Sequence, residues 1–174
     1  MGMMKMKTNN KGFTLIELIV VIAIIAIVTT ISSYSYSSVT IQRVKSFVND
    51  CDTLLSQCRV ETMSGAPSPT LTISKNSDSC TVSLRKNGTS VVEKNAPGSK
   101  NFRCTADING RNTVELEYIT FFFDRFTGEM KVESYKIVGQ PAANEGVCTK
   151  ITISNAVGEK SIMLIPQTGY HEVM

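Results

Sequence analysis

The apolar residues of this chain are concentrated in one run near the N-terminus. A polar, basic segment over residues 1–12 precedes an uninterrupted apolar stretch from Leu18 to Val28. A helix over residues 13–31 would be about 28 Å long at 1.5 Å per residue, which nearly matches a hydrocarbon core of about 30 Å. We therefore predict that residues 13–31 form a transmembrane helix.

A second apolar pattern begins at Val44, where apolar positions recur at steps of three and four residues. This spacing is typical of one face of an amphipathic helix. Glycine and proline then follow at Gly65 and Pro67, in the order that ends a helix. We predict that residues 32–64 form the amphipathic outer part of the same helix. The apolar face consists of Val44, Phe47, Val48, Cys51, Leu54, Leu55 and Cys58.

After Pro67 the pattern changes to the alternation that is typical of half-buried strands. Turns containing glycine separate seven such segments, and short turns between strands indicate an antiparallel sheet. One face of that sheet needs a cover, which the apolar face of the helix supplies. The predicted fold class is α+β: a long N-terminal helix packed on a β-rich globular domain over residues 65–174. The predicted strands cover residues 70–74, 80–86, 91–94, 114–124, 130–138, 148–155 and 160–166.

The net charge of +3 arises from 18 basic and 15 acidic residues. Lys5, Lys7 and Lys11 are the only charged residues of the first twelve, so the rest of the chain is neutral, 15 against 15. Lysines on this side of the apolar run place the N-terminus in the cytoplasm and the remaining domain outside the cytoplasmic membrane. A neutral domain does not favour binding of DNA.

Five cysteines are present, and an odd number in an exported domain leaves at least one thiol unpaired or shared between chains. Cys80, Cys104 and Cys148 are the candidates for a disulfide, with the pairing left open. Cys51 and Cys58 are interpreted as small buried residues of the helix, about 10 Å apart along its axis. Because the chain has one histidine and no C-x-x-C pair, we expect neither a metal site nor a cofactor.

Glu17 is unusual because it lies at the start of the apolar run. A carboxylate within a membrane helix costs about 2.5–3.5 kcal/mol on insertion scales, so it usually has a partner or a role. An ordinary signal peptide would instead need small residues at a cleavage site after the run, and residues 28–33 offer only a weak version. A plain membrane anchor with a tolerated glutamate is the other alternative.

The segment Lys11-Gly12-Phe13-Thr14-Leu15-Ile16-Glu17 resembles the prepilin signature of type IV pilins and type II secretion pseudopilins. The resemblance implies that a membrane prepilin peptidase cuts between Gly12 and Phe13 and that Phe13 is then N-methylated. It implies that Glu17 acts in filament assembly by meeting the positive N-terminal amine of the neighbouring subunit. Opposite charges attract strongly in a low-dielectric environment, which agrees with this role.

A weaker resemblance covers residues 119–173 and points to the GspH/FimT-like minor pseudopilin subfamily. It consists of strand-and-glycine patterns around Gly128, Gly158 and Gly169, and of the closing residues 170–173. Relatives there that bind DNA use basic C-terminal segments, which this chain lacks. The resemblances imply a minor pilin or pseudopilin of a type IV pilus or type II secretion pseudopilus, with a major pilin as the alternative. The implied partners are the peptidase, other pilins, the inner-membrane assembly platform and membrane lipid.

Catalytic chemistry finds little support in the sequence. Any Ser-His-Asp or Cys-His system would depend on His171, which we interpret as a solvated surface residue near the C-terminus. Glu115 and Glu117 are interpreted as the solvent side of a strand, and Phe121 and Phe123 as core residues. No phosphate-binding glycine loop occurs. We therefore expect a structural subunit without enzymatic activity. The rivals are a pilin-like subunit that binds DNA or a surface, as in competence or adhesion, and a membrane-tethered enzyme.

Overall fold

A computed structural model of the chain describes residues 13–65, 67–76, 79–96 and 102–174, with the side chains of residues 31–37 excepted. It divides into two compact units, residues 1–38 and 39–174, each of which is described by itself. One helix, α1 (Leu15–Met63), contributes to both units.

Helix α1 begins after Thr14 and ends close to the predicted boundary at residue 64. Its last turn is closed by hydrogen bonds from the main-chain N–H of Ser64 to the Val60 carbonyl, at 2.9 Å, and from Gly65 to Thr62, at 3.2 Å. Gly65 adopts a positive φ of 90°, as residues that terminate helices commonly do. Among the described residues no helix is both long and apolar enough to cross a membrane, so the span predicted for residues 13–31 is not confirmed.

All seven predicted strands are present, and their ends differ from the predicted ones by up to three residues. Short turns join two antiparallel pairs, as the antiparallel prediction requires: β5 pairs with β6 through the turn at residues 124–129, and β8 pairs with β9 through the Gly158 turn. The seven strands are β1 (Thr70–Asn76), β2 (Ser79–Lys86), β3 (Thr89–Asn95), β5 (Arg111–Phe123), β6 (Met130–Ile137), β8 (Cys148–Ser154) and β9 (Glu159–Ile165).

Three strands were missed: β4 (Arg103–Ile108), β7 (Ala143–Gly146) and β10 (Tyr170–Val173), which follows the short helix η1 (Pro166–Thr168). Strand β4 does alternate, but two of its three buried positions are Cys104 and Ala106, whose small side chains weaken the pattern. Strand β7 has no strand-favouring residues and is held by pairing with β6. Strand β10 is held in the same way by β9.

The ten strands found in the described residues form one antiparallel sheet in the order β10-β9-β8-β4-β5-β1-β2-β3, with β6 pairing β5 and β7. Strand β5 organises the sheet because it has three partners. Its residues 111–115 pair with β4, residues 118–122 with β1, and residues 116–123 with β6.

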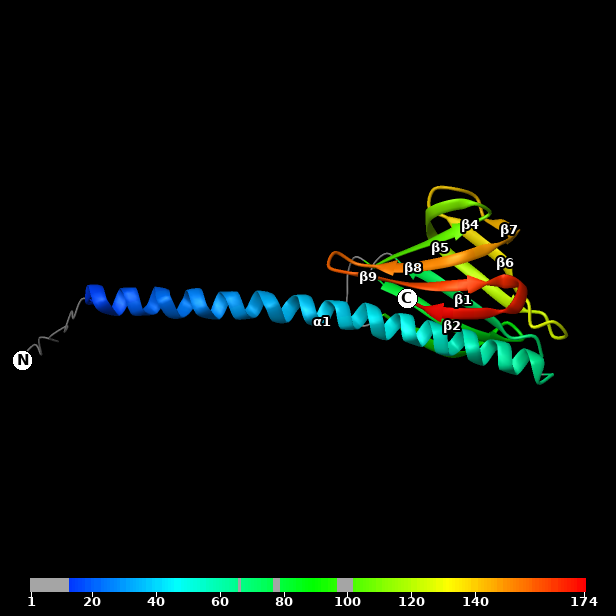
Figure 1. The fold of residues 1–174 in the computed structure, drawn as a ribbon, viewed down its shortest axis with the longest axis horizontal. Helices are drawn as coiled ribbons and strands as arrows, with labels where there is room; N and C mark the ends of the chain where they lie inside the picture. Colours follow the sequence, from blue (N-terminus) through cyan, green and yellow to red (C-terminus); the bar gives the residue numbers. More distant parts are fainter. Residues whose placement is uncertain (1–12, 66, 77–78, 97–101) are drawn as a thin grey trace, which may run out of the picture. The chain divides into compact units, whose positions relative to one another are not determined.

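Within residues 39–174, α1 lies along the sheet (Figure 1), and the buried side chains of the core come from both. All seven predicted positions of the apolar helix face are at most 4% exposed, which confirms the predicted face. Phe47 from this face meets Phe102 edge to face, with ring centroids 6.3 Å apart. The predicted core residues Phe121 and Phe123 of β5 are buried as well. The α+β arrangement of a helix packed on an antiparallel sheet is therefore confirmed.

Candidate processing and assembly site

The structure describes the predicted processing site on one side of the cut. Phe13 is the first described residue and is 86% exposed. Gly12, on the other side of the predicted cut, lies outside the described residues. Exposure of Phe13 agrees with access by an enzyme and tests neither cleavage nor methylation.

Glu17 and Thr14 cap the N-terminus of α1 reciprocally. The Thr14 main-chain N–H and its hydroxyl both donate to Glu17 Oε2 at 2.8 Å, and the Glu17 N–H donates to Thr14 Oγ1 at 3.3 Å. Together they form a capping box, in which an N-cap threonine and a glutamate three residues later satisfy each other's main-chain donors. Sequence reasoning missed this role, although Thr14-x-x-Glu17 before an apolar run is its known signal.

The capping box uses one carboxylate oxygen of Glu17. Both Thr14 donors reach Oε2, and no hydrogen bond from a described residue reaches Oε1. The side chain therefore holds its own helix end through Oε2, and Oε1 retains its capacity to accept a hydrogen bond. A positive group close to this helix end would also interact with the remaining oxygen.

The apolar side chains that follow Glu17 are exposed in the single chain. Large apolar residues from Leu18 to Val28 are between 46% and 61% exposed. Exposed apolar surface of this extent marks a site that another apolar surface covers. The exposed residues are Leu18, Ile19, Val20, Val21, Ile22, Ile24, Ile25, Ile27 and Val28.

The five cysteines are all free thiols and all buried. Burial raises the pKa of Cys80 to about 11, and it raises the pKa of Cys58 and Cys148 to about 12. Burial also raises the pKa of Cys51 and Cys104, and nearby thiols raise it further. Burial of Cys51 and Cys58 confirms their interpretation as core residues. No disulfide joins any of the five in the structure, and pairing among Cys80, Cys104 and Cys148 stays a prediction.

The interpretation of His171 as a solvated residue is wrong. Its side chain is 7% exposed, because β10 brings it against α1. Its Nε2 lies 2.9 Å from Ser56 Oγ and 3.7 Å from Asp52 Oδ1, whereas Nδ1 lies 3.3 Å from the Gly169 carbonyl oxygen. A catalytic triad needs the carboxylate on one ring nitrogen and the hydroxyl on the other. Here both are on Nε2, so the contacts attach β10 to the helix.

The paired acids of β5 take part in ion pairs across the sheet. Glu115 contacts Lys75 of β1, and the Glu117 Oε2 atom lies 2.6 Å from Lys136 Nζ of β6. These ion pairs explain the positions of both carboxylates, and no catalytic role is needed to explain them. Among the described residues, no three histidine, cysteine or acidic side chains gather closely enough to hold a metal ion.

Comparison with known proteins identifies one segment of the chain. No curated protein and no solved structure matches the chain. The likeness of residues 119–173 to the GspH/FimT-like subfamily is not confirmed. Residues 7–33 match the family model described as the prokaryotic N-terminal methylation motif. This match contains Gly12, Phe13, the capping box and all of the exposed apolar run from Leu18 to Val28. The chain therefore carries the prepilin-type N-terminal signature.

Proposed function

We propose that this chain is a structural subunit of a type IV pilus or a type II secretion pseudopilus, with no enzymatic activity of its own. A prepilin peptidase cuts the chain between Gly12 and Phe13, which removes residues 1–12. It then methylates the new N-terminal amine of Phe13. The observation that carries the proposal is the methylation motif over residues 7–33, which coincides with an exposed apolar helix surface.

Residues 13–31 have two successive environments in this proposal. They anchor the precursor in the cytoplasmic membrane, with the N-terminus cytoplasmic and residues 65–174 outside, and they later pack in the filament core. The inner-membrane assembly platform moves the subunit from one environment to the other. Lipid and neighbouring helices both supply the apolar cover that the exposed side chains need. Their burial against other subunits stabilises the filament by about 25 cal/mol per Å².

Glu17 sets the axial position of one subunit against the next. Its carboxylate pairs with the methylated amine of Phe13 on a neighbouring subunit, while Oε2 retains the cap on its own helix. Neither charge is stable alone in an apolar surrounding, so the pair favours one register. A minor pilin or pseudopilin is the proposed subtype, and a major pilin is the alternative. The fraction of this chain in purified filaments distinguishes them.

The experiment that tests the proposal is the intact mass of the full chain, expressed with and without a prepilin peptidase. With the peptidase we expect the mass of residues 13–174 plus one methyl group, and without it the unprocessed mass. Gly12→Val should prevent the change because a branched side chain obstructs the cut. Gly2→Val is the matched control, since it makes the same change within the leader and should be processed normally.

Two results would contradict the proposal. A chain that keeps residues 1–12 in the presence of active peptidase is not a substrate of that enzyme. A cut after Val28 would indicate an ordinary signal peptide, and the filament role would no longer have support.

A further inference from the structure

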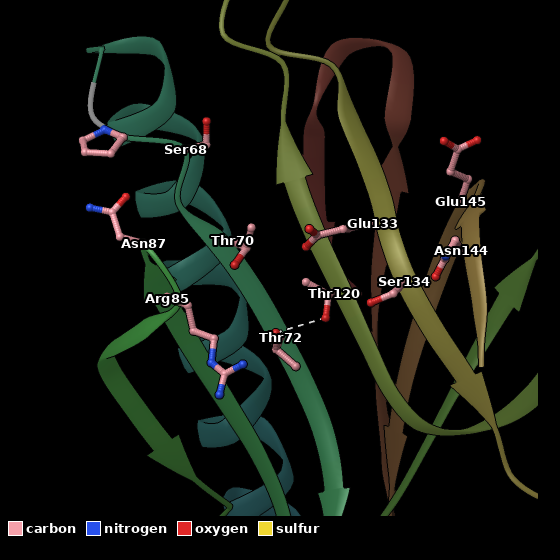
Figure 2. Close-up of a pocket in the computed structure, with 12 residues that line it drawn as sticks. Ser68, Thr70, Thr72, Arg85, Asn87, Thr120, Glu133, Ser134, Asn144 and Glu145 are labelled. Carbon is pink, nitrogen blue, oxygen red and sulfur yellow. Dashed lines mark hydrogen bonds between the residues drawn. The ribbon is translucent and has the colours of Figure 1, made fainter. Parts of the chain in front are cut away.

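The outer face of the sheet, opposite the face that packs on α1, carries a groove of about 990 Å³. It crosses β2, β1, β5, β6 and β7 within the unit of residues 39–174. Figure 2 shows Thr70 and Thr72 on one strand, Thr120 and Ser134 on the next two, and Asn144 and Glu145 on the far side. We call this hollow the sheet groove.

Short polar side chains form the floor of the sheet groove in a single cross-strand row. Thr72 is opposite Thr120, Thr120 is opposite Ser134, and Ser134 is opposite Asn144. Directly opposed residues share a face of the sheet and neighbouring strands lie about 4.8 Å apart, so the row is roughly 14 Å long. Thr72 Oγ1 and Thr120 Oγ1 are 3.1 Å apart and hydrogen-bonded.

Three charged side chains line the sheet groove around this row. Arg85 lies on the β2 side, whereas Glu133 and Glu145 lie on the side of β6 and β7. None of the three takes part in an ion pair with another described residue. Among the described residues that line the groove, these are the charged ones, which gives the groove a net charge of −1 from one arginine and two glutamates.

An apolar wall adjoins the polar row. A second hollow of about 830 Å³ shares Ser68, Thr70, Glu133 and Glu145 with the sheet groove. Phe122 and Val147 supply its apolar surface, and Glu129 and Lys131, which form an ion pair, line it as well. Ligand sites commonly combine such apolar and aromatic surface with a few placed polar groups. The two hollows together offer both kinds of surface along one path.

The side chains select the chemistry of the ligand. Hydroxyls both donate and accept, amides do both at separate atoms, and carboxylates accept. An apolar ligand would leave these groups without hydrogen bonds, which is costly. A polyanion would meet two carboxylates and one arginine, so the net charge of −1 in the groove repels it. A polyhydroxylated chain with apolar ring faces satisfies the row and the wall together.

We propose that the sheet groove binds an oligosaccharide and that Glu133 and Glu145 favour sugars with a protonated amino group. The row Thr72–Thr120–Ser134 provides hydrogen bonds to sugar hydroxyls, and Phe122 provides apolar contact for a ring face. This inference goes beyond the proposed function and does not depend on it. It concerns a surface of the folded domain, whether or not the N-terminus is processed.

The test is calorimetric titration of the full chain with β-1,4-linked tetramers of glucosamine, glucose and glucuronic acid. The chain is kept in a polyoxyethylene detergent, because a detergent with a sugar head group would compete. We expect the glucosamine tetramer to bind most tightly, then glucose, then the acidic tetramer. Failure of all three to bind at millimolar concentration, or tightest binding of the acidic tetramer, would overturn the proposal.

Variants assign the binding to the groove. Thr120→Val nearly preserves shape and should weaken binding of glucosamine and glucose tetramers about tenfold, the loss of one hydrogen bond. Glu133→Gln with Glu145→Gln should remove the preference for glucosamine and leave glucose binding within about twofold. Ser134→Ala serves as a second hydroxyl variant if Thr120→Val does not fold.

The controls make the same chemical changes outside the groove. Thr149→Val on β8 and Glu93→Gln on β3 are exposed positions that do not line it, and both variants should bind like the unaltered chain. If the controls weaken binding as much as the groove variants do, the sugars bind elsewhere and the assignment is overturned.

Discussion

Variants of Glu17 and of its hydrogen-bond partner Thr14 can separate the two roles of Glu17, helix capping and pairing between subunits. The carboxylate caps helix α1 in the single chain, through hydrogen bonds from Thr14 at 2.8 Å. The proposed filament role uses the negative charge of the same carboxylate toward a different subunit. The cap depends on both side chains, whereas the intersubunit pair depends on Glu17 alone.

We expect Glu17→Ala to abolish incorporation of the processed chain into filaments, because the neighbour's amine loses its counter-charge. Thr14→Ala removes the threonine's half of the cap and keeps the carboxylate, so its incorporation should remain near normal. The measurement is the amount of each variant in sheared filaments relative to the membrane pool. Equal loss in both variants would mean that helix capping, and not charge pairing, explains the requirement.

The buried thiols predict how stability depends on pH. A cysteine in the unfolded chain has a pKa of about 8.5, whereas burial raises that of Cys80 to about 11 and that of Cys58 to about 12. At a pH between the pKa of a thiol in the unfolded chain and its pKa in the folded chain, the unfolded chain binds fewer protons than the folded chain. The free energy of unfolding therefore falls as pH rises. This contribution is complete below about pH 8 and is lost progressively toward pH 11–12.

Urea unfolding of the full chain at pH 7, 9 and 10 checks this expectation. The free energy of unfolding should fall across the series, and Cys80→Ala should show a shallower fall because one titrating thiol is absent. Ser83→Ala on the same strand is the control, since a serine hydroxyl does not titrate there. An identical slope in Cys80→Ala and the unaltered chain would contradict a contribution from this thiol.

At the scale of elements, the end of η1 is closely packed against the β5–β6 turn. Gly169 ends η1 with φ at +63°, and a Cβ built there would overlap the carbonyl oxygen of Gly128. Arg59 of α1 also contacts η1, because its Nη2 donates a hydrogen bond to the Thr168 carbonyl at 2.9 Å. We call this contact region of α1, η1 and the β5–β6 turn the corner. This corner brings β10 to the helix, and so it determines the burial of His171.

We expect Gly169→Ala to destabilise the fold more than Gly110→Ala does. Both glycines have positive φ, so each alanine carries a strain of about 1–2 kcal/mol. Only Gly169 has no space for the methyl group, and overpacking adds about 1–3 kcal/mol. Nothing lies within 4 Å of a Cβ at Gly110. Urea unfolding of both variants measures the difference, and equal losses would show that the corner rearranges freely.

An element could be predicted from the sequence when its pattern of apolar and polar residues lies within one continuous segment. The helix face from Val44 to Cys58 was predicted correctly because its spacing is a property of one continuous segment. The same holds for the long strand β5. Strand β7 was missed because its sequence, Ala-Asn-Glu-Gly, becomes a strand only through pairing with β6.

For the whole molecule, the division into residues 1–38 and 39–174 predicts independent folding of the second unit. The helix face that covers the sheet starts at Val44, so a chain of residues 39–174 retains the complete core. We expect it to unfold cooperatively, with a midpoint within about 4 °C of the full chain, the shift caused by roughly 1 kcal/mol.

Thermal unfolding followed by circular dichroism measures this, with the full chain in detergent as reference. A start at residue 52 is the control, because it removes Val44, Phe47, Val48 and Cys51 from the core and should not fold. A chain of residues 39–174 without a cooperative transition would mean that residues 1–38 are needed for folding.

The same distinction applies to the candidate sites: features of consecutive residues were predictable, and features that join distant residues were not. The prepilin-type signature was read from consecutive residues, and the match over residues 7–33 agrees with it. The sheet groove was not predictable, because Thr72 and Thr120 are 48 residues apart and meet only through strand pairing. His171 was misjudged for a related reason, since its contact with Ser56 spans 115 residues.

The sequence by itself determined the features that depend on neighbouring residues: the N-terminal signature, the apolar run, the amphipathic helix face and most of the strands. Their patterns repeat every two or every three to four residues, and so they are visible along the chain. Only the tertiary structure decided the strand order, the burial of His171 and the row of hydroxyls on the outer face. Those features arise where distant segments pair, and the register of that pairing is a property of the folded chain as a whole.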